Sequence, residues 1–329
     1  MISQRLPAMA GQHTASTPEA ISRIRDFAQA LLAGLGKEQK AIPCRFLYDA
    51  RGSELFEQIT RLPEYYPTRT EVEILKEVSS KFLRTDEEDV ALVEFGSGSS
   101  TKTEIVLQEL IPRVSTYVAI DISPTALMDA LQRIGTRFSS VETRGIAENF
   151  HQQATLPDDL HLQPKLGFFP GSTIGNCTPD EARNLLDNMR DTLGAEARLI
   201  VGTDLVKPES VLIPAYDDAA GVTAEFSLNV LRRANRELGA CFDLNQFQHE
   251  ARWNSELQRI EIYLVCKSDQ EVYVCGVPFE FSTGERIHVE NSHKYTVDGF
   301  QQFAREAGWE VENSWTDKQQ WFAIHELVN

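Results

Sequence analysis

The sequence predicts an α/β fold in which a parallel sheet is covered by helices on both faces. Three observations lead to that fold class. From about Asp89 onward, short apolar runs alternate with helical patterns. The first run breaks into a glycine-rich turn before a helix, and the second run ends in an acidic residue. Strands that alternate with helices form parallel sheets, and such sheets bind ligands at the carboxyl ends of their strands.

Three helices are expected ahead of this alternation. The first begins near Pro18, where apolar residues recur at helical spacing. A second, short helix follows Ser53. The third is expected to open at Thr70, because Thr70-Glu71-Val72-Glu73 matches the pattern of a capping box.

The alternating region itself predicts five strands with helices between them. The expected strands are 90–96, 116–121, 139–144, 165–170 and 197–203, and the expected helices are about 102–112, 124–137 and 179–193. The last of these helices has the clearest ends, with Thr178 as N-cap, Glu181 closing a capping box and Gly194 after the last turn.

Beyond these elements the pattern changes to antiparallel strands. A helix is expected at about 219–238, and the segments 249–265 and 271–281 alternate as half-exposed antiparallel strands do. The remaining elements are a strand at 286–295, a helix at 297–307 and strands at 311–315 and 321–327. The last two strands would complete a seven-stranded sheet.

Composition excludes several classes of protein. The 329 residues include 32 basic and 49 acidic side chains, a net charge of −17 that repels nucleic acid. No apolar run approaches the roughly 20 residues of a membrane helix. Residues 1–18 have no apolar signal core, so a cytoplasmic protein is expected. The five cysteines are scattered, without metal-ligand spacing, so no metal site is expected.

The turn Gly96-Ser97-Gly98 is the first candidate binding element. A strand that ends in small residues and leads into a helix brings backbone N–H groups close to a ligand. Asp121 ends the next strand, at a distance along the chain that suits the hydroxyls of a ribose. The third glycine of the dinucleotide pattern is missing, which favours a nucleoside without phosphates, namely S-adenosylmethionine. Plain turn chemistry is the alternative for this segment alone.

Other polar residues follow strands of the predicted sheet. Gly171-Ser172-Thr173-Ile174-Gly175-Asn176 can bring backbone donors and an amide to a ligand. Asp204 is either catalytic or holds its own loop. Glu290 and Ser292 share one strand face, which is either a pocket wall or a solvated surface. The absence of a nucleophile elbow or a Ser-His-Asp order fits methyl transfer, because the cofactor then supplies the electrophile.

Together these segments resemble the histidine-specific, S-adenosylmethionine-dependent N-methyltransferases of ergothioneine biosynthesis. Those enzymes convert L-histidine to its trimethyl betaine, hercynine. The resemblance implies a seven-stranded Rossmann-like class I methyltransferase sheet with an interwoven α+β substrate-binding domain. It lies in residues 46–50 (FLYDA), 59–71 (ITRLPEYYPTRTE), 94–102, 171–176 (GSTIGN), 202–207 (GTDLVK), 215–224 (AYDDAAGVTA), 253–255 (WNS) and 290–292.

The same resemblance implies a four-part organisation of the chain. Residues 1–69 form the helical part of the substrate domain, and residues 70–204 form the methyltransferase core. Residues 205–294 form the β-rich part of the substrate domain, and residues 295–329 complete the sheet.

The cofactor site is implied residue by residue. S-adenosylmethionine is held by Gly96, by Lys102 near its carboxylate and by Asp121 on its ribose. Asn149 and Phe150 follow the third strand, where the family often has Asp-Phe to hold the adenine amino group. An amide also accepts a hydrogen bond from that group, so adenine binding at Asn149 is expected here too.

The resemblance also implies the site for the substrate, L-histidine. Tyr48 is the candidate catalytic residue, near the reacting amine, and Gly171 lies close to the amine as well. The amine must lose a proton before each attack, and either Tyr48 or a bound water is the candidate acceptor. The other residues bind the carboxylate (Asn176 and Tyr216) and the imidazole (Tyr65, Glu290 and Ser292).

One further departure from the family concerns substrate choice. The histidine enzymes often have Met beside the imidazole, where this chain has Ile262. The alternatives are therefore methylation of a tryptophan-type or ovothiol-type amine, and a module that binds the cofactor without turnover. Retention of Glu290 favours histidine. The chain is expected to act as a monomer.

Overall fold

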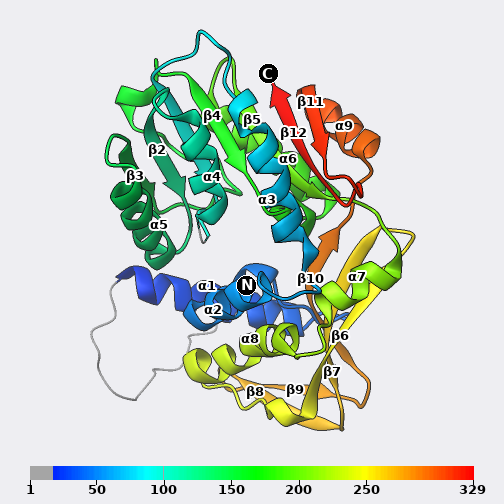
Figure 1. Cartoon of the computed structure of the whole chain (residues 1–329). Coiled ribbons are helices and arrows are strands. Elements are labelled where there is room, and N and C mark those ends of the chain that lie inside the picture. Colours follow the sequence, from blue (N-terminus) through cyan, green and yellow to red (C-terminus); the bar gives the residue numbers. More distant parts are fainter. Residues whose placement is uncertain (1–17, 99) are drawn as a thin grey trace.

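The computed structural model describes residues 18–98 and 100–329. One half of the molecule is a seven-stranded sheet of order β11-β12-β5-β4-β1-β2-β3 (Figure 1). Its strands are β1 (Val90–Phe95), β2 (Val114–Ile120), β3 (Glu142–Ile146), β4 (Lys165–Phe169), β5 (Arg198–Asp204), β11 (Glu310–Thr316) and β12 (Phe322–Val328). Neighbouring strands are parallel except at β12, which runs antiparallel to both of its neighbours. The predicted α/β fold class is confirmed.

Helices cover both faces of this sheet, because consecutive residues of each strand point to opposite sides. Leu92 and Tyr117 share one core cluster with α3 (Tyr66–Val78), α4 (Thr101–Leu110) and α5 (Pro124–Arg137). Val93 and Val118 pack on the other side, against α6 (Pro179–Leu193) and α9 (Val297–Glu306). All six residues of the interior strand β1 are buried.

The other half has a core of its own. It contains a three-stranded antiparallel sheet of order β10-β7-β6 and a two-stranded ribbon, β8-β9. This third core joins residues from 27–66 with residues from 212–289, so the N-terminal helices and the late strands pack together. The exact division of the chain into domains stays a prediction. The elements are α1 (Pro18–Leu35), α2 (Ala50–Ile59), α7 (Glu209–Tyr216), α8 (Val222–Leu238), β6 (Phe247–Asn254), β7 (Arg259–Cys266), β8 (Gln270–Val274), β9 (Val277–Phe281) and β10 (Arg286–His293).

Short 3-10 helices connect these elements. They are η1 (Cys44–Leu47), η2 (Ser79–Lys81), η3 (Asp158–Leu160), η4 (Thr173–Asn176) and η5 (Leu244–Gln246). The arrowheads of β2 and β4 point toward the half that contains α1, α2 and α8 (Figure 1). The carboxyl ends of the parallel strands therefore face the second half of the molecule.

The third helix begins one turn earlier than predicted. Tyr65 is the N-cap of α3, and Pro67 occupies its first turn. Thr70 lies inside the helix, where its hydroxyl donates to the Tyr66 carbonyl at 2.9 Å, so the expected capping box is wrong. The second helix likewise starts earlier, with Asp49 as N-cap. The capping box of Thr178 and Glu181 at α6 is confirmed.

Two further elements differ from the expectation. Helix α7 was not predicted, because it is short and has Pro214 inside it. Strand β3 begins at Glu142, later than expected. None of the described helices is long and apolar enough to cross a membrane. The prediction that there is no signal core concerns mainly residues 1–17, which lie outside the described residues.

Candidate active site

The turn after β1 borders open space at the carboxyl end of the strand. Gly96 and Gly98 have φ angles of +83° and +42°, which glycine adopts at little steric cost. A Cβ atom added to Gly96 would lie 3.4 Å from the ring of Phe150, whereas one added to Gly98 would meet nothing within 4 Å. The backbone of Gly98 is thus free to approach a ligand closely.

Asp121 follows β2 beside this turn, and backbone groups hold its carboxylate in place. Its Oδ2 atom accepts hydrogen bonds from the Ser97 amide at 3.1 Å and from the Ser97 hydroxyl at 3.2 Å. Its Oδ1 atom accepts from the Ser123 amide at 2.8 Å. Oδ2 thus accepts two hydrogen bonds and Oδ1 only one, so Oδ1 keeps a lone pair that can accept from a ribose hydroxyl.

The segment after β3 lies against the same turn. The ring of Phe150 contacts Phe169 edge-on at 5.8 Å and stacks on His151 at 5.1 Å. The Asn149 side chain accepts a hydrogen bond from the His151 amide at 3.1 Å. That bond leaves one lone pair of the Asn149 carbonyl for another donor. A role of Asn149 and Phe150 in adenine binding stays a prediction.

A buried carboxylate, predicted only as part of a helix cap, joins two predicted site residues. Glu71 of α3 pairs with the ammonium of Lys102 at 2.5 Å, and only 1% of its side chain is exposed. It also accepts from the amide of Gly171 at 2.9 Å. Glu71 therefore fixes the position of Lys102 next to the turn that follows β4.

Gly202 in β5 makes room for this carboxylate. A Cβ atom at Gly202 would lie 2.3 Å from Oε1 of Glu71. We expect Gly202→Ala to lower the free energy of unfolding by about 1–3 kcal/mol, because Glu71 cannot move without losing its partners. Thermal or urea denaturation measures the change.

Gly135→Ala is the control for Gly202→Ala. Gly135 lies in α5, where an added Cβ would meet its nearest neighbour, the Thr143 hydroxyl, at 3.6 Å. Alanine there is expected to raise stability by about 0.5–1 kcal/mol, as in an ordinary helix. Equal effects at the two sites would contradict the role given to Gly202.

Strand β10 forms a wall of the candidate site with the side chains of Glu290 and Ser292. Register places Glu290 opposite Ile262 and Ser292 opposite Ile260, so the two polar residues share one face, as predicted. The register shifts between His288 and Glu290, leaving Val289 as an extra residue. Such a bulge re-aims a side chain, and here both Val289 and Glu290 are buried.

Asn176 reaches this wall from the other half of the chain. A Cβ atom at Gly175 would lie 2.8 Å from the carbonyl oxygen of His293, so glycine lets η4 approach β10 closely. The Asn176 amide donates to Glu290 Oε1 at 3.2 Å and keeps a second N–H for a ligand. Burial raises the pKa of Glu290 to about 7, although Lys294 opposes the shift.

Three tyrosines, Tyr48, Tyr65 and Tyr216, lie near Glu290. The ring of Tyr65 lies 6.1 Å from Tyr216 and 6.2 Å from Phe56, and Tyr48 lies 5.5 Å from Phe56. Burial, followed by the Glu290 carboxylate, raises the pKa of the Tyr48 phenol well above its ordinary value. Burial and nearby acidic groups also raise the pKa values of Tyr65 and Tyr216 well above the ordinary value. All three are therefore neutral phenols at physiological pH.

Asp204, at the end of β5, forms buried ion pairs and hydrogen bonds with several other elements. It is fully buried between the ammonium groups of Lys207, at 2.5 Å, and Lys294, at 2.7 Å. The hydroxyl of Tyr66 donates to it at 2.7 Å. Of the two roles considered for Asp204, the one that ties down its surroundings fits these contacts.

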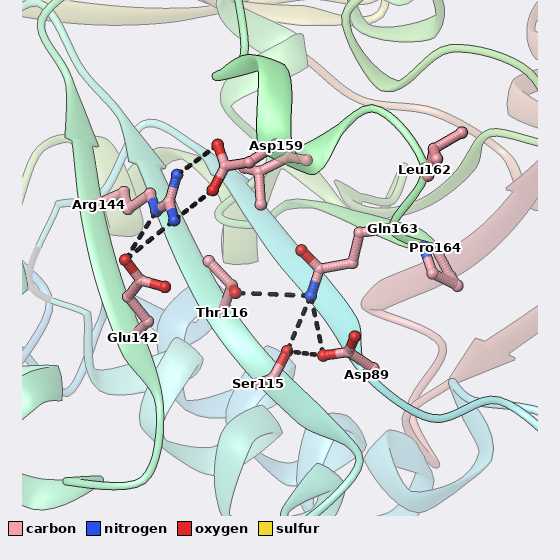
Figure 2. A pocket seen from close by; sticks show the side chains of 10 residues that line it. Asp89, Ser115, Thr116, Glu142, Arg144, Asp159, Leu162, Gln163 and Pro164 are labelled. Atoms are coloured by element: carbon pink, nitrogen blue, oxygen red, sulfur yellow. Dashed lines mark hydrogen bonds and ion pairs between the residues drawn. The ribbon is translucent and has the colours of Figure 1, made fainter.

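The opposite edge of the sheet also has a hollow (Figure 2). There Arg144 forms ion pairs with Glu142 at 2.9 Å and Asp159 at 2.6 Å. The Gln163 amide donates to Ser115 at 2.8 Å. The charges of Arg144, Glu142 and Asp159 are satisfied within the hollow, which lies at the amino ends of β2 and β3.

Among the described residues, no group of three or more His, Cys, Asp or Glu side chains could hold a metal.

Residues 27–329 match the family model described as histidine-specific, S-adenosylmethionine-dependent methyltransferase. The chain belongs to this family. It is 42% identical to histidine N-alpha-methyltransferase of Mycolicibacterium smegmatis, over 87% of this chain and 89% of that one. It is 40% identical to histidine N-alpha-methyltransferase of Mycobacterium tuberculosis, again over 87% and 89% of the two chains. A solved S-adenosylmethionine-dependent methyltransferase of Clostridium acetobutylicum has a TM-score of 0.40 at 9% identity, covering 85% of this chain and 92% of that one.

Local sequence patterns of this methyltransferase indicate the candidate site residues but not their buried partners. Glu71 matches a helix cap by pattern, and no pattern indicates a role for Lys207 or Lys294. The available signal was a charged residue inside an apolar pattern, since a buried charge almost always has a partner. The partners themselves come from other elements, so local patterns could not identify them.

Proposed function

We propose that this methyltransferase transfers methyl groups from S-adenosylmethionine to the α-amino group of L-histidine, giving hercynine, the first step of ergothioneine biosynthesis. The observation that carries the proposal is the carboxylate of Glu290, which is 8% exposed and adjoins Asn176 in a wall otherwise made of phenols and hydroxyls. A single buried acid of this kind suits a ligand with a polar ring that can donate to it.

The cofactor fits the residues at the carboxyl ends of β1 and β2. The open backbone at Gly98 allows close approach, and Asp121 accepts from ribose hydroxyls. Lys102 offers a cation to the carboxylate of the methionine part. When bound, S-adenosylmethionine supplies a methyl group on a sulfonium, which is already electrophilic. The protein therefore has to orient the amine and exclude water rather than activate the methyl donor.

The substrate residues divide by chemistry in this proposal. The free N–H of Asn176 and the hydroxyl of Tyr216 hold the carboxylate of histidine. Glu290 and Ser292 bind the imidazole nitrogens, and Tyr65 packs against the ring. A site that hydrogen-bonds a substrate ring rejects rings without those groups strongly, because its own buried groups would be left unpaired.

Tyr48 and Gly171 lie on the side of the reacting amine. The raised pKa of Tyr48 keeps it a neutral phenol. Its hydroxyl therefore orients the amine through a hydrogen bond and does not act as a phenolate base. Replacement by phenylalanine should lower turnover more than it changes the affinity for histidine.

The raised pKa of Glu290, about 7 against an ordinary 4.5, predicts a pH dependence of substrate binding. Above pH 7 the group is ionised and accepts the imidazole N–H well, and as the pH falls through 7 it becomes protonated and binds histidine less tightly. Glu290→Gln does not titrate, so the ratio of wild-type to variant affinity should fall between pH 8 and pH 6. Calorimetry at matched pH values measures this ratio, since titration of histidine itself is common to both proteins.

The same shift has a consequence for folding. Between pH 4.5 and about 7 the folded chain binds more protons at Glu290 than the unfolded chain does. Stability from this group is therefore lost as the pH rises through that window. Glu290→Gln should flatten that part of the profile of unfolding free energy against pH. An unchanged slope would contradict a raised pKa.

Turnover with a panel of amino acids tests the proposal. The purified protein with S-adenosylmethionine is expected to methylate L-histidine, through mono- and dimethyl intermediates. Preference for tryptophan, a prenylated tryptophan or a histidine-derived thiol would overturn the substrate assignment, and Ile262 would then be the first residue to exchange for Met. Absence of turnover with every amine would indicate a module that only binds the cofactor. A monomeric state and a cytoplasmic location stay predictions.

A further inference from the structure

Lys294 is a buried residue that contacts two hydroxyl groups of the proposed substrate wall. It follows β10, and its side chain is 0% exposed. Its Nζ atom lies 2.6 Å from the Tyr216 hydroxyl, 2.7 Å from the Ser292 hydroxyl and 2.7 Å from Oδ2 of Asp204. An ammonium group has three N–H donors and no acceptor. Each N–H of Lys294 therefore has one oxygen to itself.

This arrangement restricts the protons of the two hydroxyls. Tyr216 and Ser292 both accept from Lys294, so neither can donate to it. Their oxygens are 2.9 Å apart, and one hydroxyl proton lies in that contact. The other hydroxyl proton remains for a ligand. For Tyr216 to donate to the substrate's carboxylate, Ser292 has to donate to Tyr216, and Ser292 then offers its remaining lone pair to the ring.

The same lysine connects the wall to the seven-stranded sheet. Asp204 ends β5, and its carbonyl accepts from the amide of Tyr295 at 3.0 Å. The amide of Val206 donates back to the Tyr295 carbonyl at 2.9 Å. Lys294 lies next to this paired segment, so its ammonium has a fixed place relative to the strand ends where the cofactor is proposed to bind.

Charge also distinguishes this position. Asp204 lies between the ammonium groups of Lys207 and Lys294, and burial lowers the pKa of both lysines. Lys207, on the other side of Asp204, donates to Tyr66 at 2.8 Å and does not touch Tyr216 or Ser292. An anionic group on a ligand at Tyr216 is therefore favoured by Lys294 more directly than by Lys207.

We propose that Lys294 is a positioning residue for the amino-acid substrate. It holds the hydroxyls of Tyr216 and Ser292 in the orientation that receives the substrate, and its charge favours the substrate's carboxylate. This inference rests on the proposed function, because it takes histidine as the ligand. It assigns Lys207 a structural role only.

Lys294→Met and Lys207→Met form a matched pair for the test. Each variant removes one buried ammonium from the same carboxylate, so both should lower thermal stability. Lys294→Met is expected to raise the KM and the dissociation constant for histidine by about tenfold or more, the loss typical of hydrogen bonds to a charged group. The dissociation constant for S-adenosylhomocysteine should stay unchanged. Lys207→Met should keep the histidine affinity of the wild type.

If a methionine variant does not fold, Lys294→Gln and Lys207→Gln give the same comparison with a neutral donor in place. Wild-type histidine affinity in the folded Lys294 variant would overturn the inference, and so would an equal loss in the Lys207 variant. Failure of the wild-type protein to bind histidine would overturn the proposed function itself. The two failures are thereby distinguished.

Discussion

A Lys102→Met variant is expected to lose about 3–5 kcal/mol of unfolding free energy and most of its affinity for S-adenosylmethionine. The stability loss follows from Glu71, whose side chain is 1% exposed and pairs with Lys102 at 2.5 Å. Without the ammonium, the buried Glu71 carboxylate still accepts a hydrogen bond from the Gly171 amide but no longer has this cation beside it. Urea denaturation and calorimetric titration with S-adenosylhomocysteine measure the two losses separately.

A double variant separates folding from binding. Glu71→Gln combined with Lys102→Met leaves no unpaired charge, so it should recover much of the stability that the single variant loses. Cofactor affinity should not recover, because the cation proposed to face the cofactor's carboxylate is still missing. Wild-type affinity in the double variant would exclude Lys102 from the cofactor site.

A Glu290→Ala variant is expected to weaken histidine binding by about 1–3 kcal/mol, the cost of leaving a buried polar partner unpaired. Affinity for S-adenosylhomocysteine should not change, because Glu290 belongs to the proposed substrate wall on β10. Isothermal titration with histidine, at saturating S-adenosylhomocysteine, measures the effect. An unchanged dissociation constant would place Glu290 outside the pocket.

Glu261→Ala is the matched control for Glu290→Ala. Glu261 has a similar exposure, 9% against 8% for Glu290, and lies on the neighbouring strand β7. Register pairs it with Asn291, which points away from the face shared by Glu290 and Ser292. Its removal should cost stability, through the loss of its bonds to Arg259 and Tyr263, but should leave histidine affinity unchanged.

The sheet and the side of the sheet that carries the site could be predicted from sequence. Alternation of apolar runs with helices is a local pattern, and the glycine turn at Gly96 and the acid at Asp121 end two of those runs. The alternation of Glu290 and Ser292 likewise follows from strand periodicity. These features need no knowledge of distant contacts.

The supporting shell of the site could not be predicted in the same way. Glu71 pairs with Lys102, which lies 31 residues further along the chain, and Lys294 pairs with Asp204, which lies 90 residues earlier. The bulge that re-aims Glu290 depends on how β10 pairs with β7. Such contacts are set by tertiary packing, which overrides local propensity. The start of α3 shows the same limit, because Thr70 matched a cap locally but lies within the helix.

The position of the transferred methyl groups tests the central claim most directly. The protein is incubated with L-histidine and S-adenosylmethionine that carries an isotope-labelled methyl group, and the product is analysed by nuclear magnetic resonance. The account predicts that all labelled methyl groups are on the α-nitrogen and that the trimethyl betaine is the end product. Label on an imidazole nitrogen, or no labelled histidine at all, would contradict it.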